Sequence, residues 1–210
     1  EYLMSEFMHS LNIPTTRALA IIGSDEPIFR EEVETASIVL RLSKSWVRFG
    51  TFEYFYQSGD KQSLQELADF VINENYAHLK NEKNKYEKLF FEIVDRTAYL
   101  IAKWQAYGFM HGVMNTDNMS VAGYTIDYGP YAFMDNFDAN NICNHTDHEG
   151  RYSYSNQPHV AQWNLDSLAT CFSAIINENR LQEYLNGFLH MQDNEYLKIM
   201  QKKLGLDDNL

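Results

Sequence analysis

The sequence has 210 residues and a mass of 24.5 kDa, and 45% of its residues are hydrophobic and 22% charged. This apolar share is enough for a sizeable core, which excludes a wholly disordered chain. Seventeen basic against twenty-nine acidic residues give a net charge of −12, which repels phosphate backbones and anionic lipid headgroups. We therefore expect neither nucleic acid nor a membrane as a partner.

The first part of the chain predicts a helix followed by a small antiparallel pair of strands. Apolar residues recur at helical spacing over residues 1–11, and Pro14 ends this helix. Short apolar runs at 18–22 and 36–42 are typical of paired strands. Because the helical pattern is already under way at Glu1, which is not an initiator Met, we expect the chain to be a fragment.

Two further helices are predicted before the middle of the chain. An aromatic-rich segment over 45–56 has apolar side chains at helical spacing. Ser63 and Glu66 then have the S-x-x-E spacing of a capping box, in which each side chain accepts a hydrogen bond from the other residue's backbone amide. This box predicts a helix over 63–72.

A long helix over 89–107 is predicted by a broad apolar stripe that Gly108 ends. Residues 108–154 are then dense in Asn, Asp, Gly, His and Tyr, which is typical of a functional loop region. Further helices are expected at 163–176, 180–189 and 195–203. With no repeat and no flexible linker, the sequence predicts one α+β domain that is mainly α-helical.

The polar region carries a motif of the phosphoryl-transfer type. His111 and Asn118 have the spacing of a kinase catalytic loop, and a D-Y-G triplet starts at Asp127. Val113 occupies the place of the usual catalytic aspartate and cannot accept a proton. Asp117 precedes Asn118 and offers a carboxylate in its place.

The same motif offers ligands for a divalent cation. Asn118 and Asp127 supply oxygen donors, which Mg²⁺ or Mn²⁺ prefers when phosphates and water complete the shell. The apolar stretch 121–126 can form a hairpin that brings both donors to one place. The alternative is structural: Asp117 and Asn118 form a turn, and Asp127 caps a loop.

Long segments of the sequence are similar to the selenoprotein O family, from Glu1 to about residue 176. These segments are EYLMSEFMHSLNIPTTRAL, RLSKSWVRFGTFEYF, HGVMNTDNMS, TIDYGPYAFMD and ICNHTDHEGRYSYSNQPHVAQWNL. The resemblance implies a protein-kinase-like fold that binds ATP in an orientation reversed relative to kinases. It also implies transfer of AMP, in place of phosphate, to Ser, Thr or Tyr hydroxyls of target proteins.

The resemblance assigns roles to the residues of the motif. Asp117 matches the proton acceptor of the family, while Asn118 and Asp127 match its metal ligands. Asp127 also matches a residue that contacts the nucleotide. ATP is then the substrate, Mg²⁺ or Mn²⁺ the cofactor, and proteins that carry Ser, Thr or Tyr hydroxyls are the partners.

Three residues near the beginning of the chain complete the site that the resemblance implies. Arg41 and Arg48 match arginines that contact ATP, in keeping with the suitability of guanidinium groups for phosphate. Surface salt bridges are the alternative for both. Glu1 matches a helix glutamate that pairs with the nucleotide-binding lysine. That lysine and the glycine-rich loop are absent from this sequence, so the resemblance does not extend to activity of this chain by itself.

The resemblance also implies that the chain comprises parts of two lobes. Residues 1–50 match the remainder of a small lobe and the hinge, and residues 51–210 match a helical large lobe. Within the latter, residues 111–118 match the catalytic loop and residues 127–129 the metal motif. The family implies the bacterial cytoplasm, or the mitochondrion in a eukaryote.

The cysteines are given no catalytic role. Cys143 and Cys171 are too few for a disulfide scaffold and suit a reducing compartment. The redox-active Cys or selenocysteine of the family lies near the full-length C-terminus, beyond this chain. Cys143, His145 and His148 have a spacing that weakly resembles a zinc site.

The alternatives to an adenylyltransferase concern the same motif. One is a catalytically inactive pseudokinase that binds nucleotide or serves as a scaffold, and the other is a true protein kinase that uses Asp117 as its base. The loop after D-Y-G is expected to meet the protein substrate. Its ordering residues are expected to be Asn144, His145, Asp147, Arg151 and Tyr152.

Overall fold

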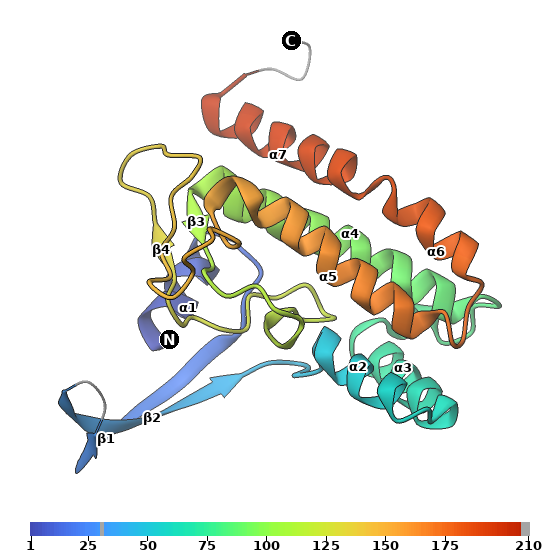
Figure 1. The fold of residues 1–210 in the computed structure, drawn as a ribbon, viewed down its shortest axis with the longest axis horizontal. Coiled ribbons are helices and arrows are strands. Elements are labelled where there is room, and N and C mark those ends of the chain that lie inside the picture. Colours follow the sequence, from blue (N-terminus) through green and yellow to red (C-terminus); the bar gives the residue numbers. More distant parts are fainter. Residues whose placement is uncertain (30–31, 207–210) are drawn as a thin grey trace.

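The computed structural model describes residues 1–29 and 32–206, and it has a mixed α+β architecture in which helices predominate (Figure 1). The α-helices are α1 (Tyr2–Ser10), α2 (Phe49–Gln57), α3 (Lys61–Asn75), α4 (Lys85–Tyr107), α5 (Gln157–Phe172), α6 (Glu178–Leu185) and α7 (Phe188–Leu204). The strands are β1 (Arg17–Phe29), β2 (Val33–Leu42), β3 (Phe109–Met110) and β4 (Ala132–Phe133). Short 3-10 turns are η1 (Ala77–Leu79), η2 (Thr116–Asn118) and η3 (Tyr154–Asn156).

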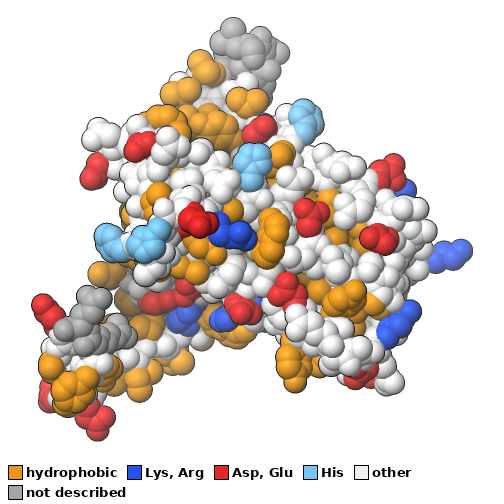
Figure 2. All heavy atoms as spheres, in the orientation of Figure 1, with side chains coloured by type: hydrophobic (Ala, Val, Ile, Leu, Met, Phe, Trp, Pro, Cys, Tyr) orange, Lys and Arg blue, Asp and Glu red, His pale blue; other side chains and the backbone are white. Residues whose placement is uncertain are grey.

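The strands β1 and β2 form an antiparallel hairpin that projects from the helical body (Figure 1). The predicted strands at 18–22 and 36–42 are confirmed, and pairing extends them to the Phe29–Val33 pair. Apolar side chains remain exposed on the hairpin, with Ile22 at 60% and Ile38 at 68% exposed, and Figure 2 shows hydrophobic surface on this projection. Backbone hydrogen bonds between the two strands satisfy the polar groups on their paired edges.

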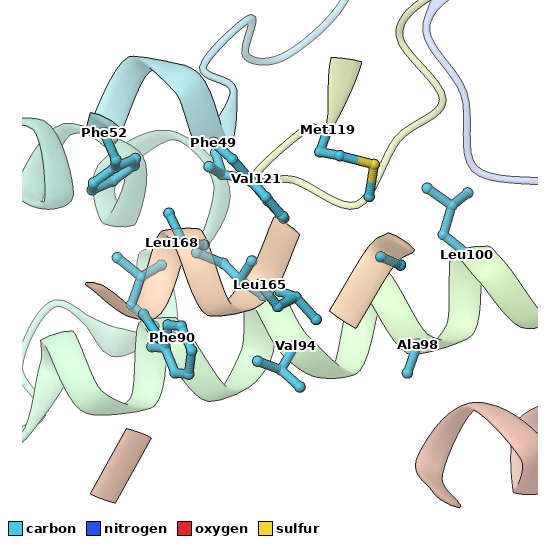
Figure 3. Packing of buried hydrophobic residues seen from close by; sticks show 14 of the residues in the cluster. Phe49, Phe52, Phe90, Val94, Ala98, Leu100, Met119, Val121, Leu165 and Leu168 are labelled. Atoms are coloured by element: carbon cyan, nitrogen blue, oxygen red, sulfur yellow. The ribbon is translucent and has the colours of Figure 1, made fainter. Parts of the chain in front are cut away.

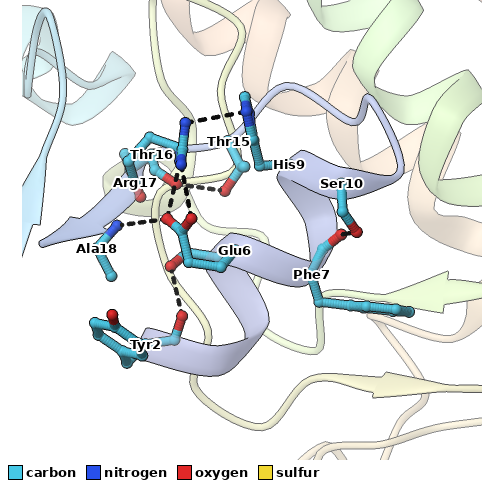
Figure 4. Close-up of polar contacts among 10 residues, drawn as sticks. Tyr2, Glu6, Phe7, His9, Ser10, Thr15, Thr16, Arg17 and Ala18 are labelled. Carbon is cyan, nitrogen blue, oxygen red and sulfur yellow. Dashed lines mark hydrogen bonds and ion pairs between the residues drawn. The ribbon is translucent and has the colours of Figure 1, made fainter.

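Helix α1 is fastened to the start of the hairpin by an ion pair. The Glu6 carboxylate accepts hydrogen bonds from Arg17 Nε at 2.8 Å and Arg17 Nη2 at 2.7 Å, and it also accepts from the backbone N–H of Ala18 at 3.0 Å (Figure 4). These bonds lower the pKa of Glu6 to about 2. The predicted end of the first helix before Pro14 is confirmed.

The core lies between α4 and the helices that pack on it. Helix α4 contacts α5, α6 and α7, and α2 packs on α5. Figure 3 shows the side chains of α2, α4 and α5 meeting those of Met119 and Val121, which belong to the polar middle region. Gly108 ends α4 with a φ of 68°, a left-handed conformation that suits glycine, as the sequence predicts.

The predicted capping box at Ser63 is wrong. The N-cap is Asp60, whose carboxylate accepts from the backbone N–H of Ser63 at 3.0 Å and from its hydroxyl at 2.6 Å. Glu66 accepts from Gln62 on the helix surface instead of bonding to the backbone of Ser63. Helix α3 therefore begins before the predicted position, because an aspartate three residues upstream caps the same first-turn amide.

The C-terminal helices are present, although their bounds differ from the predicted ones. Helix α5 begins at Gln157, ahead of the predicted 163, with Pro158 in its first turn, where a missing N–H costs little. The expected helices at 180–189 and 195–203 are α6 and the greater part of α7, which break at Gly187 and not near residue 190. None of the helices in the described ranges is long and apolar enough to cross a membrane.

Replacement of Phe172 on α5 tests how α5 packs against its neighbours. Its ring is fully buried and stacks on Phe52 at a centroid distance of 5.0 Å. We expect Phe172→Ala to lower the free energy of unfolding by about 3–5 kcal/mol, because it removes a large core side chain and leaves a cavity. Chemical denaturation measures this value. Phe70→Ala, at a ring that is 50% exposed on α3, is the control, and an equal loss in both variants would contradict the packing.

The burial of His111 predicts that the free energy of unfolding depends on pH. Burial lowers its pKa to about 4 from 6.5, against a smaller opposing effect of the Asp127 charge. Between these two values the unfolded chain takes up a proton that the folded chain does not, so stability is full above pH 6.5 and falls as the pH drops toward 4. The loss reaches about 3 kcal/mol.

The measurement is the free energy of unfolding against pH for the unaltered chain and for His111→Asn. The difference between the two at pH 8 reports packing alone, because the histidine is neutral in both states there. We expect the slope between pH 6.5 and 4 to be shallower in His111→Asn. Parallel curves for the two proteins would show that His111 is not the group responsible.

Candidate active site

The loop from His111 to Asn118 is held in place by hydrogen bonds from its own side chains and from α5. The backbone N–H of His111 donates to Gln157 Oε1 at 2.9 Å. Asn118 Nδ2 donates to the carbonyl oxygen of Val113 at 2.9 Å. Because the amide nitrogen of Asn118 is engaged there, its Oδ1 is the atom that remains to accept from, or to bind, another group.

The segment between Asn118 and Asp127 is a tight turn. Met119 and Thr125 form an isolated antiparallel bridge, and the N–H of Gly123 donates to the carbonyl oxygen of Ser120 at 3.0 Å. The predicted hairpin over 121–126 is present only as this single antiparallel bridge and its turn, since no longer pair of strands is made within this segment. The turn nevertheless reverses the chain, which brings it back toward the loop.

The D-Y-G triplet meets Glu1 and Arg41. The backbone N–H of Tyr128 donates to Glu1 Oε1 at 3.1 Å, and Glu1 Oε2 lies 3.5 Å from Arg41 Nε. The Arg41 guanidinium also lies over the Trp46 ring, 5.0 Å from its centroid. Two of the predicted residues, Glu1 from the beginning of the sequence and Arg41 from the hairpin, thus meet at the backbone of Tyr128, the residue after Asp127.

Burial shifts the ionisation of the groups next to this triplet. Tyr128 is buried and bonded to Thr15 through its hydroxyl, and burial raises the pKa of Tyr128. The Asp127 carboxylate acts electrostatically on the buried His111 ring, so the start of the loop and the triplet lie within range of each other. Nε2 of His111 has no hydrogen-bond partner within residues 1–29 and 32–206.

Asp117 and Arg48 lie where α2 meets the loop. Arg48 pairs with Ser120 through its backbone, and the N–H of Phe49 donates to the carbonyl oxygen of Met119 at 2.9 Å. The Asp117 carboxylate lies directly against Gly50, near the first turn of α2. Across the described ranges, neither predicted arginine forms a hydrogen bond or ion pair with Asn118 or Asp127.

The donors at the site fit a hard divalent cation. Asn118 Oδ1 accepts no hydrogen bond from another described residue, and amide and carboxylate oxygens such as those of Asn118 and Asp127 are ligand types that Mg²⁺ accepts when water and phosphate supply the rest. The weak zinc resemblance is wrong: the Cys143 thiol donates to the carbonyl oxygen of Pro130 at 2.7 Å. In the portion of the chain that the structure describes, no group of three or more His, Cys, Asp or Glu residues could hold a metal.

The segment after the triplet is ordered by two of the residues that we expected. Asn144 Nδ2 donates to the carbonyl oxygen of Gly112 at 3.0 Å and so fastens this segment to the loop. The Asp147 carboxylate accepts from the backbone N–H groups of Arg151 and Tyr152 at 2.9 and 2.7 Å. His145 is exposed, with no side-chain bond to a residue of the described ranges.

Two residues of the site were missed at the level of sequence, both on α2. Thr116 Oγ1 donates to Glu53 Oε2 at 2.6 Å, and Gly50 faces Asp117. Neither residue belongs to a recognisable motif with the loop, which lies more than sixty residues further along the chain. The aromatic segment containing them predicted only a helix, so no sequence signal pointed to this contact.

Known proteins show a likeness over the whole chain. The family described as Protein adenylyltransferase SelO matches residues 1–210. Proteins named "Protein nucleotidyltransferase YdiU" from Pseudomonas fluorescens (strain SBW25) and Pseudomonas putida (strain GB-1) are 52% and 50% identical over 206 residues, which is 98% of this chain. The chain spans 42% of the length of each of these relatives. It belongs to the family of Protein adenylyltransferase SelO.

Proposed function

We propose that the protein transfers AMP from ATP to Ser, Thr or Tyr hydroxyls of other proteins, with Mg²⁺ or Mn²⁺ as cofactor. The observation that carries this proposal is the arrangement of the loop. Val113 stands at the usual position of a kinase base, and its contact with Asn118 is made by its backbone carbonyl oxygen. Asp117, the residue before Asn118, has the carboxylate that can act as the base instead. The names of the family and of the relatives support nucleotidyl transfer.

The proposed chemistry is an attack by the acceptor hydroxyl on the α-phosphorus of ATP. The oxygen–phosphorus bond forms as the bond from the α-phosphorus to the oxygen that bridges to the β-phosphate breaks, and pyrophosphate leaves. Asp117 orients the hydroxyl and takes its proton. Asn118 Oδ1 and the Asp127 carboxylate would hold the cation, which supplies positive charge to the phosphate oxygens when bound.

The arginines offset phosphate charge in this proposal. Arg41 is held by Glu1 and by the Trp46 ring, so its guanidinium is oriented before a nucleotide arrives. Arg48 is the N-cap residue of α2 and lies beside the loop that carries Asp117. Positive groups fixed in advance stabilise developing negative charge better than mobile ones, because they need little reorganisation.

The proposed architecture is kinase-like. Residues 1–50 would form the rear of a small lobe and the hinge, and residues 51–210 the helical large lobe. The hairpin with helix α1 beside it, projecting from the helical body, is consistent with this division (Figure 1). The relatives named above are bacterial, and we place the reaction in the bacterial cytoplasm.

Intact-mass spectrometry after incubation with ATP and Mg²⁺ or Mn²⁺ tests the activity. We compare this chain with a longer form that carries the remaining length of the relatives, together with Asp127→Ala and Asp117→Asn in that form. The expected product is an AMP adduct on the longer form, absent in Asp127→Ala. It should form about 10²–10⁴-fold more slowly in Asp117→Asn, because the base is removed.

Asp25→Asn, an exposed change on β1, is the matched control and should leave the rate unaltered. An adduct lighter by the adenosine portion would be a phosphate and would identify a kinase. Nucleotide binding with no adduct on any form would identify a sensing or scaffolding module. Either result would overturn the proposed transfer of AMP.

A further inference from the structure

The first two turns of α2 form one wall of the loop that carries Asp117. Helix α2 and η2 are packed on each other. The N–H of Phe49 donates to the carbonyl oxygen of Met119 on one side, and Thr116 Oγ1 donates to Glu53 Oε2 on the other. The turn that contains Asp117 is therefore bonded to α2 both before and after that residue.

Gly50 lies between these two bonds, at the point where the Asp117 side chain meets the helix. A Cβ placed on Gly50 would overlap Oδ1 of Asp117 and lie 3.1 Å from its Cγ. The contact with Oδ1 is too short for atoms that are not bonded, and the contact between the two carbons is tighter than an ordinary van der Waals contact. The Asp117 carboxylate thus occupies the space that any other residue at position 50 would fill with its own side chain.

The helix itself does not require a glycine at this position. Gly50 is helical, and its φ does not lie in the left-handed region that favours glycine, unlike that of Gly59 or Gly108. Glycine inside a helix costs roughly 0.5–1 kcal/mol relative to alanine. Helix stability therefore favours alanine at position 50, while the carboxylate of Asp117 permits only glycine.

We infer that Gly50 is a positioning residue: the absence of a side chain at this position admits the Asp117 carboxylate, which the Glu53–Thr116 bond then holds in place. The positive N-terminal end of α2 lies beside that carboxylate and favours its presence there. The inference rests on the proposed function for the role of Asp117 itself. The position of its carboxylate against α2 does not depend on that function.

Gly50→Ala should have opposite effects on helix stability, which favours alanine, and on the position of the Asp117 carboxylate, which requires glycine. The variant therefore distinguishes the two. The overlapping atom is the end of a side chain, so the Asp117 carboxylate should rotate away while the helix stays intact. We expect the melting temperature to stay level or rise. We expect kcat for AMP transfer in the longer form to fall about tenfold to a hundredfold, with the KM for ATP little changed, because the acceptor hydroxyl is misoriented.

Glu53 supplies a matched pair of variants. Glu53→Gln keeps an oxygen that can accept from the Thr116 hydroxyl, whereas Glu53→Ala removes it. We expect Glu53→Gln to retain most of kcat and Glu53→Ala to lose it in part. Gly23→Ala, a change on β1 with nothing within 4 Å of the added carbon, is the control for glycine replacement.

The results for Gly50→Ala decide whether Gly50 positions the Asp117 carboxylate. Full kcat in Gly50→Ala would overturn it, as would a joint fall in kcat and melting temperature, which would indicate an ordinary packing defect. If the unaltered longer form shows no AMP transfer, the proposed function fails, and the carboxyl ¹³C signal of Asp117 in the 210-residue chain decides the positioning claim. A signal that moves in Gly50→Ala and not in Gly23→Ala supports that claim, and a signal that stays in place contradicts it.

Discussion

The structure depends on the burial of a polar loop against the helical core. Residues 109–126 carry many backbone groups away from water, and each such group without a partner costs roughly 1–3 kcal/mol. Helix α5 meets this demand: Gln157 donates to the carbonyl oxygen of Phe109 at 2.9 Å and accepts from the N–H of His111, while Asn164 donates to the carbonyl oxygen of Met114 at 2.8 Å. Both side chains are fully buried.

The same constraint explains why other polar side chains lie inside the molecule. Trp104 on α4 donates to the Thr125 hydroxyl at 3.0 Å, and the Tyr76 hydroxyl donates to the carbonyl oxygen of Val121. Buried hydrogen bonds of this kind allow few alternative arrangements, although His111 Nε2 and Asn164 Oδ1 have no partner among the described residues. The loop that carries Asp117 and Asn118 is consequently held by helices, which gives a site more precision than a free loop would.

Local patterns were the successful part of the sequence-based predictions. The apolar stripe of α4 and the glycine after it predicted that helix closely, because periodicity and a left-handed C-terminal residue are properties of a few neighbouring residues. The predicted capping box at Ser63 was wrong because it, too, was inferred from a few neighbouring residues alone. Asp60 competes for the same amide, and short motifs do not indicate which of two nearby caps is used.

The sequence by itself determined most of the helices, the β1–β2 pair, the spacing of the loop and the triplet, and the likeness to one family, since all of these depend on residues that are neighbours in the chain. Only the tertiary structure brought Glu1 and Arg41 to the amide of Tyr128, and Glu53 to Thr116. It also decided that Gly50 faces Asp117. Contacts between distant parts of the chain follow from how helices pack and where buried polar groups find partners, and no local pattern in the sequence encodes either.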